Sequence, residues 1–375
     1  MIIDDDYSVG CSLAEKFIEV RIMQRVKIKE GLQLERALWI DTRTPNEYRE
    51  GTIPGAINLP IFTNQERHRV GKLYSQDPEE AKFLALSYAA PSLPGLVDRI
   101  GELDDDRELI VFCWRGGMRS RGLVTVLQLL GFDAYQLEGG YRAFRQYVLD
   151  GLESILNQLP PMVLVYGLTG AGKTELIRVL KSTGYSALDL EDLACHRGSA
   201  FGHLGMEEEQ NQKNFEARLL FQLKEELHSP YILLEAESRC IGKIVLPDLL
   251  VKRMQEGERV LLQSSLERRV ERIVTEYAST GVNFSSQAAS SIRRLSNKLG
   301  KKRVTLLCEE LEEGAVDRVV KYLLTHYYDP LYLRSIKDKD FELVLTEDNI
   351  MTSVHKLASY LQKKTPKIEE KKKEK

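Results

Sequence analysis

This sequence has few cysteines, no long apolar run and only a small excess of one sign of charge. The five cysteines in 375 residues are odd in number and widely spaced, with no Cys/His spacing that suggests zinc, so we expect free thiols: Cys11, Cys113, Cys195, Cys240 and Cys308. No uncharged apolar stretch reaches the roughly 18 residues of a membrane-spanning helix, so no membrane partner is expected. The acidic start, residues 1–10, lacks the apolar segment of a secretory signal. These absences predict a reduced, cytoplasmic protein.

The charge balance and the length set further limits. With 53 basic and 56 acidic residues, the formal net charge is −3, so any nucleic-acid site must be a local basic patch. A chain that is 43 % hydrophobic can build packed cores, which excludes a wholly disordered protein. Its length exceeds what one core usually supports, and we expect two domains.

Strand and helix patterns alternate in the first part of the chain. Buried strands are predicted at residues 38–40, 108–112 and 133–137, with a turn and short strand within 53–60 and an apolar helix at 123–130. Such alternation predicts a parallel sheet with helices on both faces, the architecture of an α/β fold.

The pattern restarts after Pro160 and Pro161. A strand at 162–166 is followed by a glycine-rich turn and a helix at 175–181, and a further strand is predicted at 231–235. From Ser264 onward the pattern is mostly helical. The second part is therefore predicted as another α/β domain with a helical C-terminal region.

Domain boundaries follow from these patterns. Residues 14–147 form the first predicted domain, 148–160 a linker, and 161–362 the second domain with its helical extension. Residues 363–375 hold seven lysines and three glutamates and are predicted to be a disordered basic tail.

A glycine-rich loop places Cys113 between a buried strand and a helix. Backbone N–H groups of such a loop, and the helix N-terminus, favour thiolate over thiol and lower the pKa. Arg115 and Arg119 add positive charge, while Gly116 and Gly117 let the backbone turn tightly. A buried apolar cysteine is the alternative, and packing alone does not explain this arrangement. We therefore predict that Cys113 is a nucleophile.

Residues 38–145 resemble a rhodanese domain. The resemblance lies in Asp41–Tyr48, Gly51–Pro60, the cysteine loop and Leu137–Tyr141. It implies that Cys113 carries sulfur or selenium as a persulfide or its selenium analogue.

Two details of this region bear on its chemistry. The sulfurtransferase pattern C-x-x-G-x-R is one residue shorter than the stretch from Cys113 to Arg119. The longer loop, similar to those of related phosphatases and arsenate reductases, suits a larger oxyanion that carries the chalcogen. Asp41, Arg43 and Glu47 are interpreted as a salt-bridge network that braces the loop rather than as catalytic groups.

A second motif, GLTGAGKT, fits G-x-x-x-x-G-K-[ST] and lies between an apolar strand and a helix. Its phosphate-binding candidates are Gly167, Gly170, Gly172, Lys173 and Thr174, and the Thr174 hydroxyl is a candidate ligand for a magnesium ion. Glu235, which ends the predicted strand at 231–235, resembles a Walker B acid. The motif predicts a phosphate-bearing ligand, but it does not by itself imply ATP cleavage.

A rhodanese domain followed by a P-loop domain resembles the tRNA 2-selenouridine synthase family, over about residues 14–362. Other stretches similar to that family are Asp189–Gly202, Glu235–Gly242 and His326–Tyr332. Together with the sequence Cys-Trp-Arg-Gly-Gly, they make the resemblance specific.

The resemblance implies a tRNA-modifying transferase. Its substrate would be the wobble 2-thiouridine of the anticodon loop. A geranyl group from geranyl diphosphate would first give S-geranyl-2-thiouridine, and selenium from selenophosphate would then replace the sulfur. No tightly bound cofactor is implied. Selenophosphate and geranyl diphosphate are the implied co-substrates, and the enzyme that supplies selenophosphate is a candidate partner. A magnesium ion at Thr174 remains the candidate metal of the P-loop.

The same resemblance assigns roles to residues. Cys113 would accept selenium as a Cys–Se species, in a selenophosphate cradle of Trp114, Arg115, Gly116, Gly117, Met118 and Arg119. From the charge and geometry of the motif, and not from the resemblance, we infer that the P-loop would hold the diphosphate, where Lys173 and magnesium stabilise the departing charge. Second-site candidates lie just after predicted strands or in a loop: His196, Arg197, Ser199, Glu235, Glu237 and Arg239. A structural ion pair of Glu237 with Arg239 is the alternative.

A basic stretch without acidic residues runs from Ser291 to Arg303. Its cations are candidates for contacts with tRNA phosphates: Arg293, Arg294, Lys298, Lys301, Lys302 and Arg303. A solvated helix face is the alternative. Tyr327, Tyr328 and Tyr332 would either stack on bases or belong to the core.

Two other functions are compatible with the motifs. A sulfurtransferase fused to a P-loop kinase-like domain would consume thiosulfate and phosphorylate with ATP, and the longer cysteine loop argues against it. A nucleotide-gated RNA-binding module without catalysis is disfavoured by the intact Cys113.

Overall fold

Two parallel sheets organise the chain in the computed structural model, which describes residues 24–103, 106–196, 211–278, 284–346 and 349–364. The chain divides into two units, Met1–Val148 and Leu149–Lys375. Residues 148–160, predicted as a linker, are helical as far as Leu156 because helix α7 (Gly140–Leu156) continues through them. Most of the predicted basic tail, residues 365–375, lies outside the described residues.

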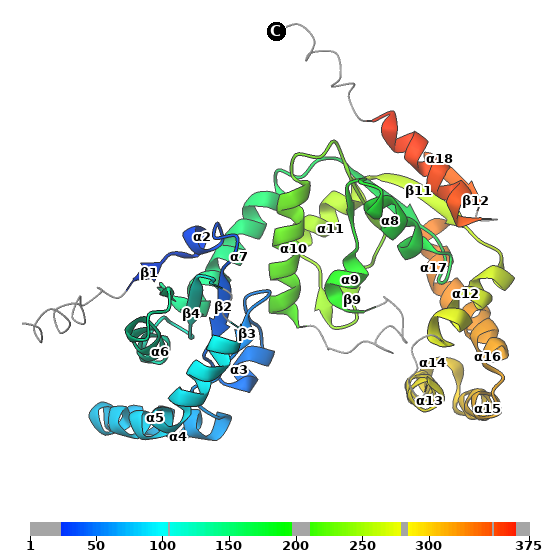
Figure 1. Cartoon of the computed structure of the whole chain (residues 1–375). Coiled ribbons are helices and arrows are strands. Elements are labelled where there is room, and N and C mark those ends of the chain that lie inside the picture. Colours follow the sequence, from blue (N-terminus) through cyan, green and yellow to red (C-terminus); the bar gives the residue numbers. More distant parts are fainter. Residues whose placement is uncertain (1–23, 104–105, 197–210, 279–283, 347–348, 365–375) are drawn as a thin grey trace, which may run out of the picture. The chain divides into compact units, whose positions relative to one another are not determined.

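The first unit contains a five-stranded parallel sheet in the order β1-β5-β4-β2-β3 (Figure 1). Its strands are β1 (Arg25–Val26), β2 (Leu38–Asp41), β3 (Ile57–Asn58), β4 (Leu109–Phe112) and β5 (Ala134–Leu137). Its helices, besides α7, are α2 (Ile28–Gly31), α3 (Pro45–Arg49), α4 (Asn64–Tyr74), α5 (Pro78–Leu103) and α6 (Met118–Leu129). The predicted parallel sheet is confirmed, whereas β1 and the α4–α5 pair were not anticipated.

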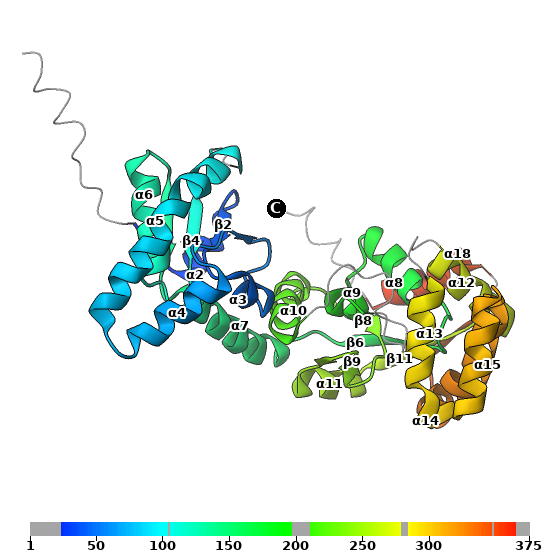
Figure 2. The ribbon, with the colours of Figure 1, turned by 90° about the horizontal axis from the view of Figure 1, so that it is seen from below.

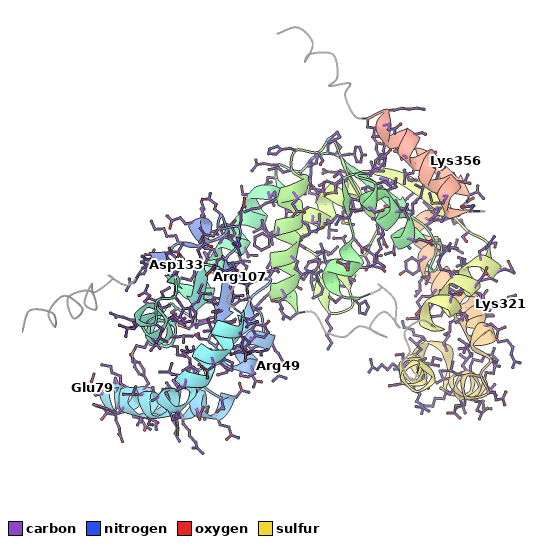
Figure 3. The ribbon with its side chains drawn as sticks, viewed as in Figure 1. Arg49, Glu79, Arg107, Asp133, Lys321 and Lys356 are labelled. Carbon is purple, nitrogen blue, oxygen red and sulfur yellow. The ribbon has the colours of Figure 1, made fainter. Side chains whose placement is uncertain are left out.

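Strand β4 is buried on both faces, which explains its unbroken apolar run. Leu109 and Val111 pack in a core with residues of α5 and α6. On the other face, the rings of Phe112 and Trp39 meet edge to face, with centroids 6.4 Å apart. The cysteine loop follows the carboxyl end of β4. Arg107 and Asp133, labelled in Figure 3, precede β4 and β5 and therefore lie at the amino ends of these strands, opposite the cysteine loop.

The second unit contains another five-stranded parallel sheet, in the order β12-β11-β6-β8-β7, and an antiparallel β9–β10 pair. The strands are β6 (Met162–Tyr166), β7 (Ala187–Leu188), β8 (Ile232–Glu235), β9 (Cys240–Ile241), β10 (Ile244–Val245), β11 (Glu258–Gln263) and β12 (Leu343–Thr346). Helices of the sheet region are α8 (Lys173–Ser182), α9 (Leu190–Ala194), α10 (Gln212–Glu226), α11 (Asp248–Gln255) and α18 (Ile350–Gln362). The predicted α/β fold is confirmed, and β12 adds a strand within a stretch that was predicted as mostly helical.

A layer of helices with its own apolar core follows β11. It comprises α12 (Leu266–Ala278), α13 (Phe284–Arg294), α14 (Ser296–Leu299), α15 (Lys301–Glu312), α16 (Val316–Leu323), the π-helix η1 (Leu324–Tyr328) and α17 (Asp329–Ile336). Figure 2 shows α13 and α15 side by side, and their residues Ile292 and Leu307 are fully buried in this core. The wide π turn lies just before Pro330, which has no N–H to donate into a regular helical ladder. This layer is the helical C-terminal region expected from the sequence.

Among the described residues, no helix is both long enough and apolar enough to cross a membrane.

Candidate functional site

The sulfur of Cys113 lies against polar donors at the carboxyl end of β4. The Gly117 N–H donates a hydrogen bond to Sγ at 3.2 Å, and the Ser120 hydroxyl donates a second at 3.3 Å. The residue is 4 % exposed, so these donors act on the sulfur with little competition from water. The thiol is therefore buried, but in a polar loop rather than in an apolar wall.

These donors lower the pKa of Cys113 below its ordinary value. Burial by itself would raise the pKa, but hydrogen bonds from the side chain and backbone of Ser120 outweigh it, helped by the Arg119 charge and the Gly117 N–H. The direction agrees with the sequence prediction of a thiolate. A thiolate is the nucleophilic form of cysteine.

A buried glutamine holds the cysteine loop in shape. The Gln136 side-chain amide donates to the carbonyls of Gly116 and Gly117 at 2.9 and 3.1 Å, and to the Ser120 hydroxyl at 3.0 Å. Gly140 has a φ of +58°, and a Cβ there would lie 2.2 Å from the Cys113 carbonyl oxygen. Only glycine fits so close to the loop. Sequence reasoning missed both Gln136 and Ser120, although Ser120 directly follows the predicted cradle.

Two ion pairs brace this region, as interpreted from the sequence. Arg43 and Asp41 form a fully buried pair at 2.6 Å, and the Arg43 guanidinium lies 4.0 Å from the ring centroid of Tyr141. Arg119 and Glu47 form a second, partly buried pair at 2.8 Å. Burial would raise the pKa of Glu47, but the hydrogen bond and charge of Arg119 hold it below its usual value.

The predicted selenophosphate cradle divides into anchored and open residues. Trp114, Arg115 and Met118 are exposed, whereas Arg119 is held by Glu47. Within the described part of the chain, Arg115 forms no ion pair, so its charge is available to an incoming anion. The loop therefore offers the Arg119 charge and the Gly117 N–H to the sulfur, and an exposed cation at Arg115.

The P-loop of the second unit connects β6 to α8. Gly170 and Gly172 have φ values of +78° and +93°, the left-handed region that glycine adopts most easily. The Lys173 ammonium donates to the Gly167 carbonyl at 3.2 Å. The predicted phosphate-binding residues thus form one turn at the start of α8.

Three carboxylates face this turn. Glu191, Glu235 and Glu237 each offer an oxygen, and these atoms lie within 4.8 Å of one another. The Thr174 hydroxyl donates to Glu191 Oε2 at 3.0 Å. Glu235 is 1 % exposed, and among the described residues its carboxylate oxygens have no hydrogen-bond partner.

The one positive charge of Lys173 does not balance these three carboxylates. Burial, then the neighbouring Glu191, raises the pKa of Glu235 well above its ordinary value despite the opposing charge of Lys173. Burial and the charge of Glu237 raise the pKa of Glu191 to about 7. Carboxylate and hydroxyl oxygens are the ligands that magnesium prefers, and a divalent cation would relieve this repulsion. The residues therefore fit the magnesium ion expected at Thr174.

A cavity of about 650 Å³ begins at the P-loop and continues into the helical layer. Lys173, Thr174, Glu191, Glu237 and Tyr332 are among the residues of its polar part. Arg272 also lines it and donates to the Gly170 carbonyl at 2.7 Å. A phosphate group at the P-loop would therefore face both carboxylates and an adjoining hollow.

The second-site candidates do not all lie together. Glu235 and Glu237 belong to the carboxylate cluster, while the His196 ring lies over Gly242. Arg239 pairs with Asp248 at 2.7 Å rather than with Glu237, so the suggested Glu237–Arg239 ion pair is wrong. The remaining candidates, Arg197 and Ser199, lie outside the described residues.

The basic stretch is mostly exposed, on and between α13, α14 and α15. The exposed cations are Arg293, Arg294, Lys298, Lys301 and Lys302. Arg303 is partly buried, with its guanidinium 3.8 Å from the ring centroid of Tyr322. Tyr328 belongs to the core of the helical layer, Tyr327 packs against it, and Tyr332 lines the cavity.

Sequence reasoning missed two residues at the P-loop. Glu191 lies two residues after Asp189, the N-cap of α9, in a stretch that only its similarity to the family marks in the sequence. Arg272 lies on α12, far along the chain, and no local motif marks it. Strand order and helix packing bring both to the phosphate loop.

Comparison with known proteins supports the division into two kinds of domain. A family profile described as the tRNA 2-selenouridine synthase AAA domain matches residues 160–365. A profile described as the rhodanese-like domain matches residues 25–147.

Curated proteins with the name tRNA 2-selenouridine synthase are similar over most of this chain. That of Pseudomonas fluorescens is 35 % identical over 326 residues, which covers 78 % of this chain and 87 % of the relative. That of Shewanella denitrificans is 30 % identical over 364 residues, which covers 89 % of this chain and 97 % of the relative. That of Sulfurovum sp. is 31 % identical over 323 residues, which covers 78 % of this chain and 87 % of the relative.

Among solved structures, TT1252 from Thermus thermophilus is 17 % identical, covers 55 % of this chain and 98 % of its own, and has a TM-score of 0.29. A likeness at this level supports no argument about function.

Proposed function

Because the chain belongs to the tRNA 2-selenouridine synthase family, we propose that it replaces the sulfur of wobble 2-thiouridine in tRNA by selenium. Selenophosphate is the proposed selenium donor, and geranyl diphosphate the proposed source of an S-geranyl intermediate. The observation that carries this proposal is that one chain holds both a thiolate-stabilising oxyanion loop and a P-loop that faces three carboxylates.

Geranyl transfer is assigned to the P-loop. The base sulfur attacks the first carbon of geranyl diphosphate, so that a C–S bond forms while the C–O bond breaks and diphosphate leaves with the electron pair. The N3 proton of the base passes to solvent, which leaves the neutral S-geranylated base. The P-loop N–H groups and Lys173 hold the diphosphate and stabilise its growing charge. A magnesium ion, held by Thr174, Glu191 and Glu235, would neutralise further phosphate charge.

Selenation is assigned to the cysteine loop. Selenide attacks C2 of the S-geranylated base, and geranylthiolate leaves. Geranylthiolate is a better leaving group than the sulfur of an unmodified thiocarbonyl. Geranylation would therefore prepare the base for its exchange of sulfur for selenium. The phosphate of selenophosphate would be held by the loop N–H groups, Arg115 and Arg119.

We propose that Cys113 attacks phosphorus. An S–P bond then forms, the P–Se bond breaks and selenide leaves; water later takes the phosphoryl group from the cysteine. Selenium and phosphorus keep their oxidation states throughout. The Cys–Se species implied by the family resemblance needs an S–Se bond, which requires an oxidant or the release of phosphite. The longer, phosphatase-like loop supports the phosphorus route.

The test is reconstitution with purified protein and tRNA that bears 2-thiouridine. With magnesium, geranyl diphosphate and selenophosphate, nucleoside mass spectrometry should show S-geranyl-2-thiouridine and then 2-selenouridine. A mass increase of a phosphoryl group on Cys113 would support the phosphorus route, and a selenium adduct would support the alternative. No seleno-nucleoside under any of these conditions would refute the proposed function.

A further inference from the structure

The cavity at the P-loop continues as an apolar chamber inside the helical layer. Side chains from α13, α15, α16 and η1 form its walls: Ala288, Ile292, Leu311, Val319, Val320, Leu323 and Leu324. Each of them is at most 8 % exposed. Packing defects in protein cores are few and small, so an apolar hollow within a cavity of about 650 Å³ calls for an occupant.

The polar and apolar parts of this cavity adjoin at the phosphate loop. Ile273 touches the loop directly, because a Cβ on Gly170 would lie 2.8 Å from its Cδ1. Arg272, the residue before it, donates to the Gly170 carbonyl and pairs with Glu175 at 3.3 Å. Helix α12 therefore presents the Arg272 cation to the phosphate side and the Ile273 hydrocarbon side chain to the apolar side.

A second ion pair fixes the helical layer to the loop. Arg269, which is buried, and Asp329, which is partly buried, form an ion pair with two contacts, at 2.7 and 2.8 Å. Arg269 also donates to the Thr169 carbonyl at 3.3 Å. Asp329 begins α17, directly after the π-helix whose residue Leu324 lines the chamber. The chamber wall and the phosphate loop are thus held in one arrangement.

We propose that this chamber binds the hydrocarbon chain of an isoprenoid diphosphate and sets the length of chain that is accepted. The proposal rests on the proposed function, since the diphosphate must lie at the P-loop. A nucleotide would place a polar sugar and base in a chamber that offers them few hydrogen-bonding groups, whereas a branched hydrocarbon matches its walls.

Two neighbouring alanines provide a matched test. Ala288 lines the chamber, whereas Ala289, which is equally buried, is not among the residues that line it. Ala288→Leu should fill part of the chamber and weaken the binding of geranyl diphosphate roughly tenfold or more. It should leave the binding of inorganic diphosphate unchanged. Ala289→Leu is the control for disturbed packing and should affect both ligands equally or not at all.

If Ala288→Leu does not fold, a second variant tests the same proposal. Leu323→Ala enlarges the chamber, and it should shift the preference from geranyl diphosphate toward the longer farnesyl diphosphate.

The measurement is calorimetric binding to the full-length protein with magnesium. In the unchanged protein, geranyl diphosphate should bind on the order of a hundredfold more tightly than inorganic diphosphate, because the chain is buried. Equal binding of the two ligands, or no change of chain preference in Leu323→Ala, would refute the proposed role of the chamber. Selenation of tRNA that already carries S-geranyl-2-thiouridine would still proceed in that case, which separates this failure from failure of the proposed function.

Discussion

The guanidinium of Arg119 lies 2.8 Å from the carboxylate of Glu47, an ion pair that ties the end of the cysteine loop to helix α3. Arg119 also helps to lower the pKa of Cys113. The positive charge beside the sulfur is therefore fixed in place before any substrate binds.

The first prediction concerns this charge. Arg119→Gln should raise the pKa of Cys113, because the thiolate loses a stabilising cation. The midpoint of thiolate formation then moves to higher pH, and less thiolate is present at neutral pH. The measurement is a pH titration of thiolate ultraviolet absorbance, taken as the difference from Cys113→Ser. Arg121→Gln, on the exposed side of α6, is the control, and an equal shift in both variants would contradict a specific role of Arg119.

The second prediction separates the two half-reactions. Cys113→Ser should abolish incorporation of selenium, while tRNA binding and formation of S-geranyl-2-thiouridine persist, since the P-loop is intact. Both products are measured by nucleoside mass spectrometry. Continued selenation in this variant would remove Cys113 from the mechanism.

The third prediction concerns the P-loop. Lys173→Ala should lower the rate of geranylation by on the order of a hundredfold or more, because the departing diphosphate loses a charged donor. The affinity for tRNA should change little. Equal losses of rate and tRNA affinity would mean that the P-loop binds the RNA backbone instead.

The fourth prediction concerns the exposed basic stretch. Replacing Arg293, Lys298 and Lys301 by Glu should weaken tRNA binding and flatten its dependence on salt, because each lost phosphate contact lowers the number of released counterions. Arg303→Gln is a useful contrast, since this guanidinium is stacked on Tyr322. If the salt dependence of tRNA binding does not change in the triple variant, the basic stretch does not contact tRNA phosphates.

The fifth prediction concerns stability. Arg43→Met leaves Asp41 as a buried carboxylate without its ion-pair partner, and we expect a loss of about 3–5 kcal/mol in the free energy of unfolding of the first unit. Arg49→Met, at an exposed position labelled in Figure 3, should change it by less than about 0.5 kcal/mol.

Chemical denaturation measures this difference. The chain has two tryptophans, Trp39 and Trp114, and both lie in the first unit, so intrinsic fluorescence reports on that unit. Equal unfolding midpoints of the two variants would show that the buried pair does not stabilise the fold.

Features encoded in consecutive residues could be predicted from the sequence. The P-loop is one such feature, because its glycines adopt positive φ values within a single turn between a strand and a helix. The lowered pKa of Cys113 is another, since its donors Gly117 and Ser120 lie within the same loop. The central strands were also predictable, because burial on both faces requires unbroken apolar runs.

Features that depend on tertiary packing could not be predicted in the same way. Glu191, Glu235 and Glu237 meet at the P-loop because β7, β8 and β6 are adjacent in the sheet, and nothing in a local pattern gives that order. Strand β12 exists through its pairing with β11, in a stretch with helices on either side. The apolar chamber likewise arises from helices that each look like ordinary core helices in sequence.

The most direct measurement is mass spectrometry of tRNA nucleosides from cells grown with selenium, with and without the gene for this chain. The account predicts that 2-selenouridine disappears when the gene is deleted, returns with the intact gene, and does not return with Cys113→Ser. Undiminished 2-selenouridine in the deleted cells would contradict it.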